Sequence, residues 1–183
     1  NVYDVTSLMR LIKIEDTEII KPFNCGDDDL NGFLLEDARF YQEQLIANTF
    51  IWEDDEETIA FFSLLNDKIS QTTMDKNLWR KLRRAFPHQK HLGSYPAVKI
   101  GRLGVAASHR GEGIGTDIVS AVKQMLINHQ SVSATRFLTV DAYHSAVSFY
   151  EKNGFRPLVN ESCEDTFPMY FDLIQLINVY IHT

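Results

Sequence analysis

A glycine-rich segment between an expected strand and an expected long helix constrains the fold of this chain more than any other feature. Residues 110–115 have the sequence Arg-Gly-Glu-Gly-Ile-Gly. Glycine adopts positive φ at little cost and lets a ligand approach the backbone closely. Free amides at a helix N-terminus favour an anion. Strand, glycine-rich loop and helix in this order predict a site for a diphosphate group, although a short glycine-rich loop by itself is also consistent with a tight turn.

The spacing of these glycines differs from both common nucleotide-binding motifs. No Lys-Ser or Lys-Thr pair follows them as in a P-loop, and the segment lacks the GxGxxG pattern of dinucleotide-binding proteins. ATP and NAD are therefore poor candidates for the ligand.

Hydrophobic periodicity predicts strands and helices in alternation along the rest of the chain. Three aspartates at positions 27–29 indicate the start of the first helix, because carboxylates cap free amides there. Strands are expected at residues 8–15, 48–53, 58–69, 95–105, 136–141 and 167–174, and helices at residues 27–45, 76–84, from 114 onward and 145–152. This alternation predicts a mixed α/β fold.

Length and composition support one domain over residues 1–183. A chain of 183 residues with 44% hydrophobic residues buries a core without metal or disulfide support. Cys25 and Cys163 are far apart and lack a CxxC partner, so we expect structural thiols and no metal site. No apolar stretch is long enough for a membrane span, and no basic-then-apolar leader is present, so a cytoplasmic location is expected.

A second segment indicates which kind of protein the glycine-rich loop belongs to. Residues 145–155 have the sequence Ser-Ala-Val-Ser-Phe-Tyr-Glu-Lys-Asn-Gly-Phe. Together the two segments resemble the GNAT superfamily of N-acetyltransferases, whose signature is Arg/Gln-x-x-Gly-x-Gly/Ala followed later by Tyr-x-x-x-Gly-Phe. The resemblance implies one twisted, mostly antiparallel sheet of six to seven strands with helices on both faces. It also implies acetyl-CoA as co-substrate, a primary amine of a small molecule, peptide or protein as acceptor, and no metal.

The resemblance further implies roles for individual residues. Tyr150 would protonate the leaving thiolate of the coenzyme as a general acid. Glu112 would have to point away from the bound anion, and Tyr143 stands where many members of the superfamily have an asparagine that holds the coenzyme. The pantetheine arm would bind the backbone of Leu103, Gly104 and Val105, and the pyrophosphate would bind the amides of Arg110, Gly111, Glu112, Gly113, Ile114, Gly115 and Thr116, with added charge from Arg110.

The sequence does not decide which group acts as the general base. The attacking amine must be neutral, and an amine with a pKa near ~10.4 needs a proton acceptor, whereas an α-amino group near ~8 does not. Glu53, Asp141 and a water molecule held by backbone carbonyls are the candidates.

The N-terminal half is similar to a narrower group, the GNAT-type toxins of toxin–antitoxin modules. The similarity lies in residues 23–34 and 101–105. It implies acetylation of the amino acid on charged tRNA, with an antitoxin as partner. A basic amphipathic helix would bind the tRNA backbone through Lys76, Arg80, Arg83 and Arg84, close to Lys81 and Lys90. The net charge of −7 argues against a broad RNA-binding surface, so a purely structural helix is the competing interpretation.

Two further alternatives follow from the sequence. A module that binds acyl-CoA without turnover is consistent with Tyr143 and with the absence of an obvious base. The apolar C-terminal residues Leu176, Ile177, Val179 and Ile181 predict either packing on the domain or a subunit contact, such as that of a homodimer.

Overall fold

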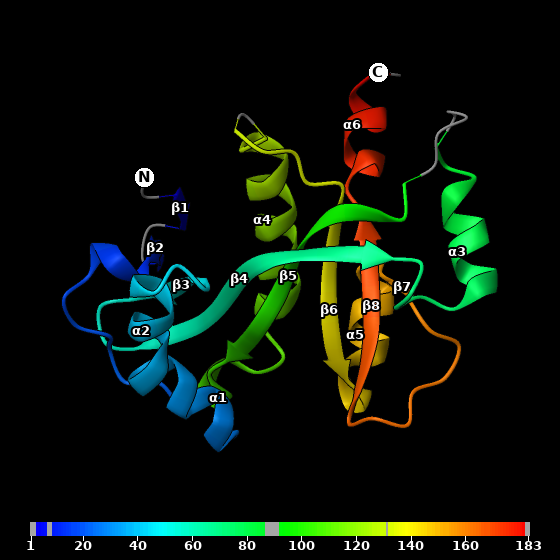
Figure 1. Ribbon diagram of the computed structural model, residues 1–183. Helices are drawn as coiled ribbons and strands as arrows, with labels where there is room; N and C mark the ends of the chain where they lie inside the picture. Colours follow the sequence, from blue (N-terminus) through cyan, green and yellow to red (C-terminus); the bar gives the residue numbers. More distant parts are fainter. Residues whose placement is uncertain (1–2, 7–8, 87–91, 131, 182–183) are drawn as a thin grey trace. The chain divides into compact units, whose positions relative to one another are not determined.

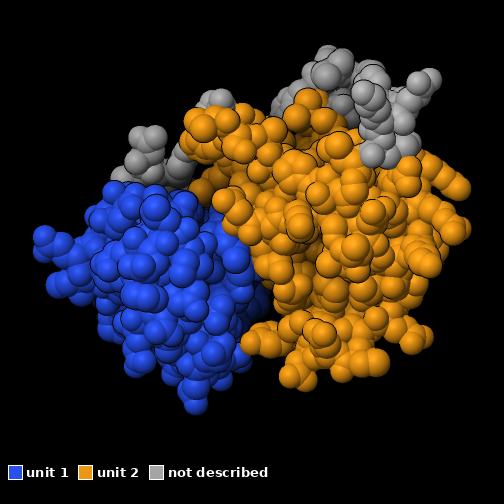
Figure 2. Space-filling view, viewed as in Figure 1, with its two compact units in different colours: residues 1–65, 100–120 blue, residues 66–99, 121–183 orange. Residues whose placement is uncertain are grey.

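The computed structural model describes residues 3–6, 9–86, 92–130 and 132–181. The chain divides into two compact units, which Figure 2 colours separately. Unit 1 comprises residues 1–65 and 100–120, and unit 2 comprises residues 66–99 and 121–183. The predicted Lys90 lies outside the described residues.

Eight strands form one sheet within the described parts of the chain (Figure 1), in the order β1-β2-β3-β4-β5-β6-β8-β7. Their bounds are β1 Tyr3–Thr6, β2 Met9–Lys13, β3 Asn48–Glu53, β4 Thr58–Ser70, β5 Ser94–Val105, β6 Phe137–Tyr143, β7 Arg156–Pro157 and β8 Thr166–Asp172. β1 pairs antiparallel with β2, β2 with β3, and β3 with β4. β8 pairs antiparallel with both β6 and β7. The predicted mixed α/β fold with a mostly antiparallel sheet is confirmed. The sheet has more strands than the expected six or seven because β1 and β7 are too short to produce a hydrophobic pattern.

The helices follow the predicted order as far as residue 152, and one further helix follows the last strand. They are α1 Asp28–Gly32, α2 Ala38–Glu43, α3 Lys76–Arg83, α4 Ile114–Asn128, α5 Val147–Lys152 and α6 Ile174–Ile181. A π-helical turn, Phe33–Asp37, joins α1 to α2, so the expected first helix is continuous but not regular. None of the helices in the described ranges is long and apolar enough to cross a membrane.

Unit 1 contains an aromatic core that fixes the end of β5. Phe61 is fully buried and lies edge-on to Phe23 and stacked on Phe33. A Cβ on Gly104 would lie 2.9 Å from the Phe61 ring, so only glycine fits there without a shift of the ring. Asp27 caps α1 as predicted, since its carboxylate accepts hydrogen bonds from the amides of Asp29 and Leu30.

Unit 2 contains a second core beneath α3. Trp79 and Leu82 are the buried residues of this helix, and they pack in one cluster with Tyr95 and Phe137. The prediction of an amphipathic basic helix at this position is thereby confirmed.

Candidate active site

The glycine-rich loop lies in unit 1, between β5 and α4. Gly111 has φ +82° and Gly113 has φ +79°, and a Cβ at either position would have no heavy atom within 4 Å. Packing therefore does not explain these two glycines, whereas the positive φ angles do. The space beside the loop is open to a ligand, which fits the predicted binding of a pyrophosphate.

Hydrogen bonds to neighbouring strands hold the start of this loop. The amide of Ala106 donates to the carbonyl of Ile59 at 2.7 Å, and the amide of Ala107 donates to the carbonyl of Asn24 at 2.9 Å. In the described chain, no backbone hydrogen bond outside helices and strands uses the amides of residues 111–116. These amides stand at the start of a 15-residue helix and are suited to an anion.

His109 is a loop residue that the sequence analysis missed. Its Nε2 lies 2.9 Å from a carboxylate oxygen of Glu57, and its Nδ1 lies 2.9 Å from a carboxylate oxygen of Glu112. The hydrogen bond with Glu112, followed by the one with Glu57, raises the pKa of His109 above its usual value. His109 thus holds the Glu112 carboxylate, and that this carboxylate points away from a bound anion stays a prediction. The partner Glu57 is 52 positions away along the chain, so no local pattern could reveal the pair.

Arg110 is engaged within the fold of unit 1. Its guanidinium donates to the backbone carbonyl of Cys25 and lies against Gly26, where a Cβ would be 3.0 Å from Nη2. This contact connects the loop to the segment that precedes α1. The Arg110 side chain would have to leave this contact, or share it, to bind the coenzyme as predicted. Cys25 is buried, in agreement with the expected structural thiol, whereas Cys163 is exposed.

Asp54, Glu57 and His109 are the one group of described residues whose side chains come close enough to share a metal ion. Both ring nitrogens of His109 already face carboxylates. Asp54 accepts hydrogen bonds from the amides of Glu56 and Glu57, and these lower the pKa of its carboxyl. These hydrogen bonds explain why the three side chains lie close together without a metal ion. The absence of a metal stays a prediction.

Tyr150 lies in unit 2 on α5. Its side chain is buried at 6% exposure between the rings of Phe149 and Phe155. Burial raises the pKa of its phenol to about 12, so the hydroxyl keeps its proton at neutral pH. A protonated hydroxyl is what a general acid requires.

Lys123 of α4 supports the end of α5. Its Nζ donates to the backbone carbonyl of Asn153 at 2.6 Å and lies 3.7 Å from the centroid of the Phe171 ring. Burial lowers the pKa of Lys123 to about 8. A cation at a helix C-terminus stabilises the last carbonyls, so this contact helps to fix the helix that carries Tyr150.

The two candidate bases have different surroundings. Glu53 of unit 1 is buried at 5% exposure and forms ion pairs with Arg10 and Lys21. Asp141 of unit 2 is exposed, and its carboxylate lies 2.8 Å from Nζ of Lys99. Asp141 is exposed and lines a pocket of unit 2 whereas Glu53 is buried, so of the two carboxylates Asp141 is the more accessible to a substrate.

This pocket has a volume of about 580 Å³ and carries more acidic than basic groups. Asp67 accepts a hydrogen bond from Thr139 at 2.6 Å and lies 3.8 Å from Nζ of Lys99. Glu161 and Glu164 also line it, and neither forms an ion pair within the described part of the chain. Such a pocket suits a ligand that carries an ammonium group.

The basic helix α3 presents its charges outward. Lys76, Arg80 and Arg84 are exposed, whereas Arg83 is half-buried. Tyr143 is also exposed, at 47%. Of the C-terminal apolar residues, Leu176 is half-buried and Ile177 is exposed. The side chains of Val179 and Ile181 are not among those that the structure describes.

Residues 89–170 match the sequence model of the acetyltransferase (GNAT) domain. The loop, α5 and Tyr150 all fall within this range, so this part of the chain is similar to the GNAT acetyltransferase domain. The predicted resemblance to the GNAT superfamily is confirmed, and with it the class of enzyme, an N-acetyltransferase.

Solved structures of bacterial toxins have the same fold. AtaT complexed with acetyl-methionyl-tRNAfMet matches with a TM-score of 0.78 and 20% identity over 94% of this chain and 99% of AtaT. A mutant of KacT matches with a TM-score of 0.77 and 20% identity, over 94% of this chain and 99% of KacT. A mutant AtaT bound to acetyl-CoA and the C-terminus of the antitoxin AtaR matches with a TM-score of 0.72 and 17% identity, over 94% and 98% of the two chains.

Proposed function

We propose that this protein transfers the acetyl group of acetyl-CoA to a primary amine, with the glycine-rich loop as the coenzyme site. The observation that carries this proposal is the pair Gly111 and Gly113, both at positive φ beside open space. The amides of residues 111–116 would hold the pyrophosphate, and the backbone of residues 103–105 would hold the pantetheine arm and stabilise the oxyanion.

Tyr150 supplies the proton in the proposed mechanism. The neutral amine attacks the thioester carbonyl, the bond from carbon to sulfur breaks, and the Tyr150 hydroxyl protonates the departing sulfur. The burial that raises the pKa of this phenol to about 12 keeps the proton available until a thiolate forms.

The acidic pocket of unit 2 is the proposed acceptor site. Asp141 would take the proton that the amine loses, directly or through water, and Lys99 would hold this carboxylate in place at 2.8 Å. The excess of carboxylates supports an acceptor that enters as an ammonium ion.

Replacing Tyr150 with phenylalanine tests the assigned proton donor. We expect kcat to fall roughly 100-fold because general acid catalysis is lost, while the affinity for acetyl-CoA stays unchanged. Release of free thiol measures the rate, and calorimetry measures the affinity. Tyr41→Phe, at a tyrosine packed on Phe33 in unit 1, is the matched control. An undiminished kcat in the Tyr150 variant would contradict the assigned role.

Acetylation of aminoacyl-tRNA is the second candidate function. Two observations favour it: the fold is shared with AtaT, whose structure contains acetyl-methionyl-tRNAfMet, and α3 exposes Lys76, Arg80 and Arg84. The half-buried Arg83 is a weaker candidate for contact with tRNA. An antitoxin partner is supported only by the complexes of AtaT with AtaR.

Labelled acetyl-CoA distinguishes the two candidates. The protein is incubated with charged tRNA in one reaction and with free amino acids, polyamines and peptides in another. Label on tRNA that is lost when Lys76, Arg80 and Arg84 are replaced by methionine assigns the toxin-like activity. Label confined to the second pool assigns an ordinary N-acetyltransferase, and binding of acetyl-CoA without any thiol release assigns a non-catalytic module. A cytoplasmic location and a homodimer stay predictions.

A further inference from the structure

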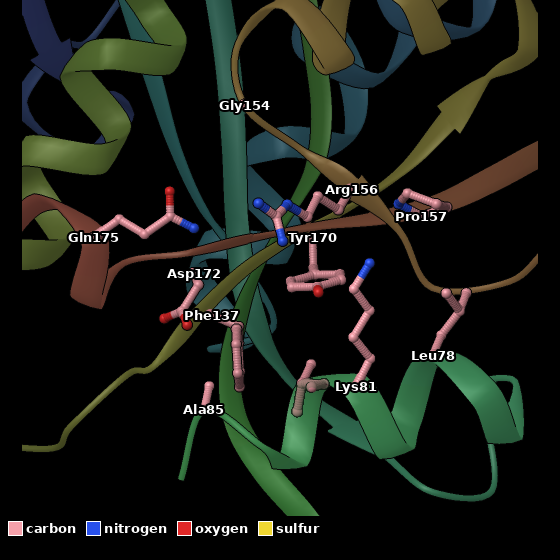
Figure 3. A pocket seen from close by; sticks show the side chains of 11 residues that line it. Leu78, Lys81, Ala85, Phe137, Gly154, Arg156, Pro157, Tyr170, Asp172 and Gln175 are labelled. Atoms are coloured by element: carbon pink, nitrogen blue, oxygen red, sulfur yellow. The ribbon is translucent and has the colours of Figure 1, made fainter.

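A second cavity of unit 2 shares no lining residue with the proposed acceptor pocket. It has a volume of about 340 Å³, and side chains of α3, β6, β7, β8 and α6 line it (Figure 3). Cavities of about 300–1,000 Å³ are typical of sites for small ligands. The proposed acetyl transfer leaves this cavity without a role.

Two uncompensated cations face this cavity. Lys81 projects from α3 and Arg156 from β7, and in the view of Figure 3 their charged ends lie on either side of the Tyr170 ring. Neither cation has an acidic partner among the described residues. The cavity's one acidic side chain, Asp172, is already bound by Arg136 through contacts of 2.6 and 2.9 Å. The cavity therefore has an excess of positive charge.

Tyr170 adds a hydrogen-bond donor between these cations. It is half-buried on β8, and burial is the main cause that raises the pKa of its phenol, so the hydroxyl remains protonated. The hydroxyl makes no side-chain hydrogen bond within the described part of the chain. A ligand oxygen at this position would receive donors from Tyr170, Lys81 and Arg156 together.

The remaining lining is apolar. Phe137 and Leu82 form its buried floor, with the Phe137 ring edge-on to Tyr170 at a centroid distance of 5.7 Å, and the half-buried Leu78 and Pro157 provide its accessible apolar surface. Such a surface suits the apolar part of a ligand, as aliphatic linings of ligand pockets generally do.

We propose that this cavity binds a phosphate monoester. A phosphate monoester has about −1.5 to −2 charges at pH 7, which matches the two cations better than a singly charged carboxylate does. Arginine and lysine are both common phosphate ligands. The apolar part of the ligand lies against Leu78 and Pro157 while the phosphate contacts Arg156, Lys81 and Tyr170. This site shares no residue with the pyrophosphate loop and does not depend on the proposed acetyl transfer.

Calorimetric titration with phenyl phosphate tests the site. Saturating acetyl-CoA is present throughout, so that the glycine-rich loop does not provide the signal. We expect Lys81→Met and Arg156→Met each to weaken binding about tenfold, because each removes a charge-assisted hydrogen bond. Lys152→Met, at an exposed lysine of α5 that does not line the cavity, is the matched control and should bind like the unmodified protein.

Two results would overturn the proposal. One is that phenyl phosphate does not bind to the unmodified protein. The other is that the three variants bind it equally well, because the cations of the cavity would then have no part in binding. Both readouts are independent of acetyl transfer, so a failure here is distinguishable from a failure of the proposed function.

A second titration identifies the source of the phosphate. A short RNA with a 5′-phosphate is compared with the same RNA carrying a 5′-hydroxyl. A preference for the phosphorylated end that disappears in Arg156→Met assigns the site to the end of a nucleic acid. Equal binding of the two RNAs, together with specific binding of phenyl phosphate, assigns it to a small phosphorylated molecule.

Discussion

At the scale of single residues, His109 links the glycine-rich loop to the turn between β3 and β4. Each of its ring nitrogens faces one carboxylate, and a charged imidazolium is the form that can donate to both Glu57 and Glu112. The loop that is proposed to hold the pyrophosphate thus depends on a titratable contact.

The stability of this contact should depend on pH. The pKa of His109 in the folded protein is raised above the unfolded value of about 6.5. The contribution of His109 is therefore fully present below that value and is lost as the pH rises through the folded pKa. We expect His109→Gln to lower the free energy of unfolding more at about pH 6 than at about pH 9. Urea denaturation at the two pH values measures the difference, and an equal loss at both would contradict the prediction.

At the scale of elements, the loop before α4 requires glycine at position 113. At φ +79° a side chain other than glycine is strained by about 1–3 kcal/mol unless the loop changes shape. We expect Gly113→Val to weaken acetyl-CoA binding about tenfold or more, since every ~1.4 kcal/mol is a factor of ten.

Calorimetry with acetyl-CoA measures this effect. Gly32→Val is the matched control, because Gly32 lies in α1 with ordinary helical angles and open space around it. Unchanged affinity in the Gly113 variant would show that the loop is not the coenzyme site.

Local patterns account for the elements that could be predicted. The hairpin of β3 and β4, the amphipathic α3 and the loop before α4 each depend on residues close together in sequence, so periodicity and glycine spacing reveal them. The π-helical turn at Phe33–Asp37 has the same apolar spacing as an ordinary helix and was not predicted. The C-terminal apolar segment was recognised, but not its helix α6.

Only those residues of the candidate site that belong to a short sequence motif could be predicted. Gly111, Gly113 and Tyr150 belong to short motifs, whereas the contacts of His109 with Glu57 and of Lys123 with Asn153 join residues 52 and 30 positions apart. The cavity between α3 and β8 likewise depends on tertiary packing. Nothing in the order of its residues along the chain indicates that Lys81 and Arg156 face the same space.

At the scale of the whole molecule, β4 and β5 each contribute to both compact units. The boundary between the units falls after Leu65 in β4 and before Ile100 in β5. Unfolding of either unit would therefore leave two strands of the other ending in mid-strand. This sharing predicts that the two units unfold in one cooperative transition, as expected for a single domain over residues 1–183.

The two tryptophans of the chain allow this prediction to be tested. Trp52 lies in unit 1 and Trp79 in unit 2, and neither indole nitrogen has a hydrogen-bond partner among the described residues, so replacement by phenylalanine breaks no such bond there. In Trp79→Phe the fluorescence reports unit 1, and in Trp52→Phe it reports unit 2. Adding Phe61→Ala to each removes a fully buried ring of unit 1 and should cost about 3–5 kcal/mol. If the units unfold together, both reporters shift to the same lower urea midpoint, whereas a shift confined to Trp52 would establish two independently folding units.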